Sequence, residues 1–347
     1  MKTPMRVMTE RPLNAETPAE YLTSWITPNS VFFDRNQGAI PPRRIALRRW
    51  RLAVEGEVET PVTLTFDRLC RMPKAIAADT LECSGNGRSL MNEKTAGNPW
   101  TIGGVGNAVW GGVWLRDVLA EAGLKPAARH VAFEGFDTPL GSAGVKFIRS
   151  IPLEKALSST LLAYEMNGEP LPLKHGYPLR ALALGWAGAN CVKWLHRIMV
   201  RERPWEGFYM DSVYRLFQKG QDPRSGEVVT GLKLKSIITR PQPGEALNAG
   251  TIAILGAAYA GEADVERVDV STDGDATWTP AEFIGPHEPY AWRQWHFLWE
   301  ARERGSYTIM ARAVDAGGRE QPMQAEINAL GYGNNGVREH AVPVTII

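Results

Sequence analysis

The chain has 347 residues, a length that predicts two domains at roughly 100–200 residues per domain. Hydrophobic residues make up 44% and charged residues 22%, values typical of a soluble globular protein, and they exclude a disordered chain and a coiled coil. Lys and Arg number 39 against 38 Asp and Glu, so no overall electrostatic field favours nucleic acid or an acidic membrane.

The three cysteines are Cys70, Cys83 and Cys191, and no two of them form a Cys-x-x-Cys pair. This pattern argues against a disulfide framework, a zinc ribbon, a cysteine-ligated iron–sulfur cluster and a covalently attached haem. No apolar segment typical of a signal peptide stands near residue 1, and the longest nearly apolar run, 181–189, is too short to cross a bilayer. We therefore expect a cytoplasmic protein without a membrane span, with a trimmed leader and a periplasmic location as the alternative.

In the first two thirds of the chain, short strands alternate with short helices. Strands are expected at 51–58, 77–83, 130–135 and 192–200. Helices are expected at 64–72, with Thr65 as N-cap, at 115–122, ended by Gly123, and at 153–162. The run 179–184 is too short and too close to glycines for an assignment.

The last third of the chain has a different pattern. Residues 230–248, with Pro241 and Pro243, are expected to form a connector. Strand-like runs separated by turn residues follow at 251–259, 265–272, 292–299, 306–314 and 341–347. This spacing is typical of an immunoglobulin-like β-sandwich. The predicted class is therefore α+β, with a mixed α/β domain over 1–235 and the sandwich over 236–347.

The segment Leu-Glu-Cys-Ser-Gly-Asn-Gly-Arg, residues 81–88, carries the first chemical signal. A turn of small residues after a strand can direct backbone N–H groups at an anion, and the guanidinium of Arg88 favours the thiolate form of Cys83. A thiolate is both a nucleophile and a soft metal ligand. The residues alone leave three readings of Cys83 open: a buried structural thiol, a nucleophile and a metal ligand.

This segment resembles the Cys-Ala-Gly-Asn-x-Arg signature of the sulfite oxidase family of molybdenum enzymes. Four more segments resemble family motifs in the same order, namely ITPNSVFFDRN at 26–36, AYEMNGEPLP at 163–172, HGYPLR at 175–180 and GANCVKWL at 188–195. The runs 268–274 and 291–295 look like the family's dimerisation domain. The resemblance covers nearly the whole chain from about Arg11.

The resemblance implies one molybdenum per chain, held by molybdopterin, with Cys83 as the protein thiolate that completes the metal site. It implies that Tyr164, Arg35, Arg88 and Arg293 are catalytic and that the same four residues and Trp110 bind substrate. The cofactor-binding residues implied by motif position are Phe33, Asp34, Arg35, Asn36, Gln37, Cys83, Asp137, His175, Arg180, Cys191, Val192 and Lys193. Two residues depart from the pattern, because Gln37 stands where many relatives have His and Gly87 where an Arg is common.

The implied activity is oxidation of sulfite to sulfate, with electrons passed to an external acceptor such as a cytochrome c. We expect no haem, because no cytochrome b5 sequence is present, and a homodimer formed through the second domain. Two alternatives stay open. One is the same cofactor acting on another sulfur compound, a sulfoxide or another oxyanion, and the other is a binding module without turnover. Retention of both Cys83 and Tyr164 counts against the binding module.

Overall fold

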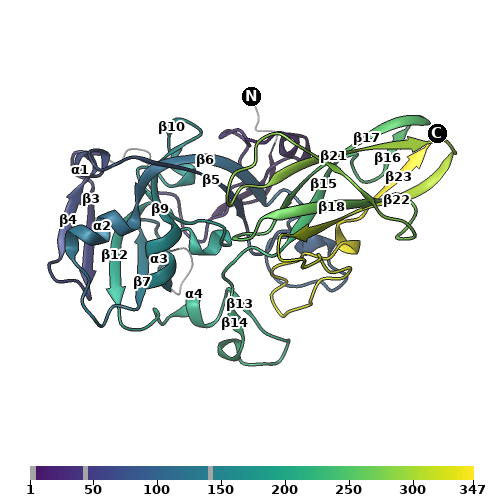
Figure 1. Cartoon of the computed structure of the whole chain (residues 1–347). Helices are drawn as coiled ribbons and strands as arrows, with labels where there is room; N and C mark the ends of the chain where they lie inside the picture. The colour runs from purple at the N-terminus through teal and green to yellow at the C-terminus, as the bar shows by residue number, and fades with distance from the viewer. Residues whose placement is uncertain (1–4, 42–45, 140–143) are drawn as a thin grey trace.

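The computed structural model describes residues 5–41, 46–139 and 144–347, and its chain is mostly β-structure. An N-terminal part, from β1 to β14, lies beside a C-terminal part, from β15 to β23 (Figure 1). The α-helices of the described residues are short: α1 (Phe66–Cys70), α2 (Leu115–Ala122), α3 (Leu153–Ser159) and α4 (Phe208–Asp211). Across the described ranges, no helix combines the length and apolar character needed to cross a membrane.

Two five-stranded sheets form the frame of the N-terminal part. One has the order β10-β9-β6-β5 with β11 also paired to β9, and the other has the order β4-β3-β12-β7-β8. The strands of the first sheet are β5 (Ala75–Glu82), β6 (Val105–Trp114), β9 (Thr160–Met166), β10 (Glu169–Pro170) and β11 (Arg180–Ala183). Those of the second are β3 (Arg51–Gly56), β4 (Val62–Thr65), β7 (His130–Gly135), β8 (Ile148–Pro152) and β12 (Leu195–Arg201).

Two hairpins and six short 3₁₀ turns complete the regular structure of the described residues. The hairpins are β1 (Arg6–Glu10) with β2 (Leu13–Glu16), and β13 (Arg215–Leu216) with β14 (Glu227–Val228). The 3₁₀ turns are Ala19–Thr23, Arg88–Leu90, Leu173–His175, Gly188–Asn190, Pro223–Ser225 and Arg338–His340. Three of these turns, Arg88–Leu90, Leu173–His175 and Gly188–Asn190, adjoin or overlap sequence motifs described above.

The Thr65 N-cap and the end of the helix before Gly123 are confirmed, although the helix expected at 64–72 is shorter and covers only α1 (Phe66–Cys70). The Thr65 hydroxyl accepts a hydrogen bond from the Arg68 N–H at 3.1 Å, as expected of an N-cap, and α2 ends before Gly123, whose φ is +65°. The helix expected over 153–162 is wrong at its end, because α3 stops at Ser159 and β9 begins at Thr160. β9 pairs with both β6 and β11, and this sheet pairing overrides the local helical preference.

β6 was not predicted, because its paired glycines are typical of turns rather than of a strand. All but two of its ten residues are buried, and it occupies the interior of its sheet between β5 and β9. Gly112 faces a very close neighbour: a Cβ built there would lie 2.1 Å from the carbonyl oxygen of Leu162 on β9. The glycine therefore permits the close approach of two strands.

The C-terminal part consists of two sheets whose apolar faces pack together, which confirms the predicted sandwich. The four-stranded sheet runs β15-β17-β21-β20 and the five-stranded sheet β16-β23-β22-β18-β19. Their strands are β15 (Lys235–Arg240), β16 (Glu245–Leu247), β17 (Gly250–Tyr259), β18 (Val265–Ser271), β19 (Thr279–Pro280), β20 (Glu282–Ile284), β21 (Arg293–Ala301), β22 (Gly305–Asp315) and β23 (Val342–Ile346). The connector expected at 230–248 therefore contains two strands, β15 and β16.

A buried polar cluster joins the two parts beneath the 81–88 segment. The Glu82 carboxylate accepts hydrogen bonds from Lys235 Nζ at 2.5 Å and from the Tyr259 hydroxyl at 2.8 Å, both supplied by the C-terminal part. Asn86 Nδ2 donates to the same oxygen at 3.0 Å. All four residues are buried. A buried carboxylate with three donors is well compensated, so this cluster fixes how the C-terminal part sits against the Cys83 turn.

Candidate active site

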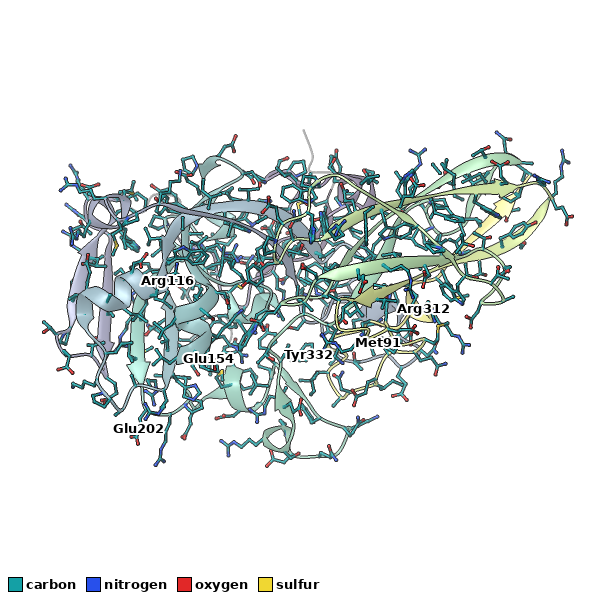
Figure 2. All side chains as sticks on the ribbon, in the orientation of Figure 1. Met91, Arg116, Glu154, Glu202, Arg312 and Tyr332 are labelled. Atoms are coloured by element: carbon teal, nitrogen blue, oxygen red, sulfur yellow. The ribbon has the colours of Figure 1, made fainter. Side chains whose placement is uncertain are left out.

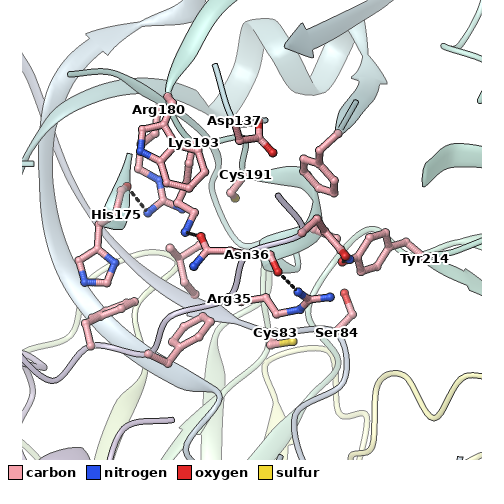
Figure 3. A pocket seen from close by; sticks show the side chains of 18 residues that line it. Arg35, Asn36, Cys83, Ser84, Asp137, His175, Arg180, Cys191, Lys193 and Tyr214 are labelled. Atoms are coloured by element: carbon pink, nitrogen blue, oxygen red, sulfur yellow. Dashed lines mark hydrogen bonds between the residues drawn. The ribbon is translucent and has the colours of Figure 1, made fainter. Parts of the chain in front are cut away.

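A cavity in the N-terminal part collects most of the residues that the motifs single out (Figure 3). Its walls come from the 32–37 segment, the end of β5, the turns after β7 and β11, and Tyr214. The lining residues are Phe32, Phe33, Arg35, Asn36, Gln37, Leu81, Cys83, Ser84, Asp137, Phe147, His175, Arg180, Gly188, Ala189, Cys191, Lys193, Trp194 and Tyr214. Ten of the twelve expected cofactor-binding residues are among them.

Cys83 lies directly after β5, where the strand becomes a turn. Its N–H donates to the carbonyl oxygen of Gly104 at 2.8 Å, and its own carbonyl accepts from the Asn86 N–H at 2.8 Å. These two bonds tie the turn to the sheet and orient the buried thiol toward the cavity, where Figure 3 shows the sulfur near Arg35. A single thiol held rigidly at a cavity wall is suited to act as one ligand of a metal that other groups also hold.

Positive groups outnumber negative ones along the cavity. Arg35, Arg180 and Lys193 line it, with Asp137 as the one lining carboxyl. Burial lowers the pKa of Lys193 to about 7, with the nearby charge of Arg180 also opposing its protonation. Burial raises the pKa of Asp137 to about 6. An anion bound here would relieve the repulsion among the cations, so the electrostatics suit a phosphate group.

Hydrogen-bonding capacity left unused in the cavity also fits a bound ligand. Arg180 donates to the carbonyl oxygen of His175 at 3.0 Å and lies 5.0 Å over the Trp110 ring, but its buried Nε has no partner among the described residues. Burial, helped by Lys174 and Lys193, lowers the pKa of His175, so its imidazole is neutral. Together with the Cys83 thiol, these donors fit a molybdopterin whose phosphate and pterin edge need polar partners and whose metal needs one thiolate.

Arg88 lies behind the Cys83 turn and outside the lining set. Its Nε and Nη2 donate to the carbonyl oxygen of Leu330 at 3.1 and 2.9 Å, and its Nη1 donates to that of Asn98 at 2.9 Å. The side chain is buried, and no carboxylate within the described ranges pairs with it. The partners of this buried guanidinium are neutral carbonyl oxygens, so its surroundings are attractive to an anion.

Tyr164, which was expected at the active site, lies elsewhere in the structure. Successive residues of a strand point to opposite faces, and on β9 it is Ala163 that packs in the same cluster as Cys83. Tyr164 points the other way, into the core beside Phe66, with ring centroids 5.9 Å apart. Its hydroxyl therefore cannot reach the cavity.

Arg293 and Trp110 also lie outside the lining set. Arg293 begins β21 in the sandwich, where its guanidinium lies 4.0 Å over the Phe283 ring. Trp110 is fully buried in β6, with its ring beneath the guanidinium of Arg180. The expected third arginine of the anion pocket is thus placed elsewhere, and Trp110 supports Arg180 instead of facing substrate.

Two expected cofactor residues, Asp34 and Val192, flank lining residues without lining the cavity themselves. The Asp34 carboxylate accepts a hydrogen bond from Lys174 Nζ at 2.9 Å. Val192 packs in the apolar core, and its carbonyl oxygen accepts from the Ala181 N–H at 2.9 Å. The residues on either side of each, Phe33 and Arg35, and Cys191 and Lys193, line the cavity.

Tyr214 was not predicted, yet it lines the cavity. Gln37 Nε2 donates to its hydroxyl oxygen at 2.6 Å, and the guanidinium of Arg149 lies 5.3 Å over its ring. Its ring also stacks on Tyr332 at 5.5 Å. No local pattern marks Tyr214, because it reaches the cavity only through packing on residues distant in sequence. Ser84 was missed too, although it stands inside the recognised signature.

Comparison with known proteins agrees with these features. A model of the oxidoreductase molybdopterin binding domain matches residues 37–209, and one of the Mo-co oxidoreductase dimerisation domain matches residues 227–345. Mitochondrial sulfite oxidase of Rattus norvegicus is 38% identical over 92% of this chain and 61% of its own length. Sulfite oxidase of Gallus gallus is 37% identical over 92% of this chain and 73% of its own length.

A solved structure shares the whole fold. The sulfane dehydrogenase SoxCD from Paracoccus pantotrophus superposes with a TM-score of 0.83 and 29% identity, covering 99% of this chain and 91% of that chain. The present chain spans about three fifths of the length of the rat relative. With the Cys83 turn, the cationic cavity and the β-sandwich all in place, these similarities show that the chain belongs to the sulfite oxidase family of molybdopterin-dependent oxidoreductases.

Proposed function

We propose that this protein oxidises sulfite to sulfate and passes the electrons to an external acceptor. The observation that carries the proposal is the convergence of the Cys83 thiol with Arg35, Arg180 and Lys193 around one cavity. The two sulfite oxidases that match over 92% of the chain support the same reaction. In that reaction sulfite and water give sulfate, two electrons and two protons.

Some of these residues are suited to bind the cofactor and others to bind the substrate. Molybdopterin-bound molybdenum, when present, supplies the two-electron redox chemistry, with Cys83 as its protein ligand. Lys193, His175 and Arg180 are suited to the phosphate and the pterin edge. Arg35 lines the cavity and is suited to bind the substrate anion directly, whereas the buried charge of Arg88 behind the Cys83 turn attracts that anion.

Tyr214 takes the role that the sequence assigned to Tyr164. Its oxygen accepts the hydrogen bond from Gln37, which leaves the phenolic hydrogen free to donate to an anion oxygen. Gln37, at a position where many relatives have His, thus fixes the direction in which the hydroxyl donates. An uncharged partner at this position keeps that direction independent of pH.

The test is sulfite-dependent reduction of ferricyanide by protein purified from a host that makes molybdopterin. We expect about one molybdenum per chain in wild-type protein and loss of turnover in Cys83→Ser, because a serine oxygen is a harder ligand than thiolate. Cys70→Ser, at an exposed thiol, is the matched control and retains activity. Full turnover by Cys83→Ser would contradict the proposal, as would molybdenum-loaded wild-type protein that does not oxidise sulfite.

We also propose the finer features expected from the sequence and from the family resemblance. They are an immunoglobulin-like class for the sandwich, a domain boundary at 235/236, homodimerisation through the sandwich, no haem, and a cytochrome c as the acceptor. A cytoplasmic location is a further proposal. The family model of a dimerisation domain over 227–345 supports the dimer.

A further inference from the structure

The hydroxyl of Ser84 lies at the cavity wall and has no hydrogen-bond partner among the described residues. Ser84 follows Cys83 directly and is only 6% exposed, and its Oγ is buried. Because buried polar groups are nearly always hydrogen-bonded, an unpartnered hydroxyl at a cavity wall points to a missing ligand. The family signature has alanine at this position, so the hydroxyl is an addition in this chain.

Tyr332 offers a second free hydroxyl from the C-terminal part. Figure 2 places it at the junction of the two parts; the residue is 8% exposed, and its ring stacks on Tyr214 with an interplanar angle of 16°. The guanidinium of Arg88 lies 5.4 Å from the ring centroid. The backbone N–H and carbonyl oxygen of Tyr332 bond to the Asn328 side chain, and among the described residues the phenolic hydroxyl has no hydrogen-bond partner.

The two hydroxyls lie on segments that contact each other. The N–H of Gly333 donates to the carbonyl oxygen of Ser84 at 2.8 Å, so the residue after Tyr332 is bonded to the residue after Cys83. Burial and Tyr214 raise the pKa of Tyr332, and Arg88 and Arg35 oppose the rise, so the phenol lies within the electrostatic field of both arginines. Both hydroxyls therefore belong to the same small region of the molecule.

Arg293, expected as the third guanidinium of the anion site, stacks on Phe283 in the sandwich instead. An anion with three or four oxygens has more acceptor positions than Arg35 and Tyr214 can satisfy. Resting on the proposed function, we propose that Ser84 and Tyr332 are substrate-binding residues, whose hydroxyls donate hydrogen bonds to a sulfur oxyanion that Arg35 binds and the charge of Arg88 attracts. The two neutral donors take the place of a third positive charge.

The experiment measures sulfate binding to the molybdenum-loaded protein by calorimetry and, separately, the kinetics of sulfite oxidation. Ser84→Ala and Tyr332→Phe each remove one hydroxyl and keep the surrounding packing. We expect each to weaken sulfate binding about tenfold and to raise KM for sulfite by a similar factor, since a hydrogen bond to a charged group is worth about that much. Because both hydroxyls act on one ligand, the loss of sulfate affinity in the double variant should differ from the product of the losses in the two single variants.

Matched controls remove hydroxyls elsewhere. Ser89→Ala deletes a hydroxyl that donates to the Trp100 carbonyl, and Tyr307→Phe deletes an exposed phenol that donates to the Glu303 carbonyl. Both controls should bind sulfate as wild type does. Unchanged sulfate affinity and unchanged KM in Ser84→Ala and Tyr332→Phe would overturn the proposal, as would wild-type protein that binds no sulfate.

The outcomes separate this inference from the proposed function. If wild type oxidises sulfite and both variants behave like it, the hydroxyls have no part in binding and the function stands. If wild type binds sulfate and the variants bind it more weakly, yet no sulfite is oxidised, the oxyanion site stands and the assigned reaction fails. A purely structural role for Tyr332 would lower thermal stability in Tyr332→Phe without a matching change in sulfate affinity.

Discussion

Lys193 is the residue whose charge depends most on what fills the cavity. Its pKa of about 7 lies below the usual value because burial and Arg180 disfavour the ammonium form. The side chain is therefore charged below about pH 7 in the empty protein and neutral above it. A bound phosphate favours the charged form, so phosphate binding takes up a proton when the pH is above that value.

We expect inorganic phosphate to bind cofactor-free protein more weakly as the pH rises from 6 to 9, as calorimetry at several pH values would measure. In Lys193→Arg the guanidinium stays charged throughout this range, so the decline should be shallower. Asp137 is common to both proteins, and its ionisation above about pH 6 contributes equally to each. Identical pH profiles for wild type and Lys193→Arg would show that Lys193 does not contact the anion.

At the same scale, the motifs located some site residues and missed others for a physical reason. Cys83, His175 and Arg180 stand inside contiguous signatures, and the structure brings all three to one cavity. Tyr214 has no such signature, because its place depends on packing against Arg149. The tyrosine that the motif did contain, Tyr164, faces away because strand alternation turns it into the opposite core.

At the scale of elements, the sequence indicated most strands that alternate and most helices with a clear cap. It failed where sheet pairing decides the structure. β9 forms from residues that read as the end of a helix, and β6 forms from a stretch whose glycines read as a turn. In both cases the deciding contacts come from neighbouring strands far away in sequence, which no local pattern can contain.

The pairing of β6 with β9 gives a direct prediction. Gly112→Ala places a methyl group 2.1 Å from a backbone oxygen of β9, which a rotating side chain cannot relieve. We expect a loss of about 1–3 kcal/mol in the free energy of unfolding, measured with urea. Gly231→Ala is the control, since a Cβ there meets nothing within 4 Å and its φ is not in the left-handed region. Equal stability of the two variants would mean that β6 and β9 can move apart without lowering the free energy of unfolding.

At the scale of the whole molecule, the Glu82 cluster holds the C-terminal part against the Cys83 turn. Lys235→Met removes the positive partner and leaves the Glu82 carboxylate buried beside Tyr259 and Asn86. We expect a loss of about 3–5 kcal/mol, because an unpaired buried charge is costly. Lys74→Met breaks the half-exposed ion pair with Glu165, where Nζ and Oε2 are 2.6 Å apart, and should cost less than about 1 kcal/mol.

Urea unfolding of both lysine variants checks this difference. The prediction fails if Lys235→Met is no less stable than Lys74→Met. A second transition in the unfolding curve of Lys235→Met alone would indicate that the C-terminal part separates from the N-terminal part before either unfolds.

The bonds between Arg88 and Leu330 also set an order of events during protein synthesis. The two residues are 242 positions apart, so a ribosome adding roughly 5–20 residues per second needs about 12 to 50 s to make the second after the first. During that interval the Arg88 guanidinium lacks its Leu330 carbonyl, and the segment that carries Tyr332 does not yet exist. The proposed anion site is therefore complete only after residues 330–332 have been made, and a chain terminated before them would hold the Cys83 turn without the segment that carries Tyr332.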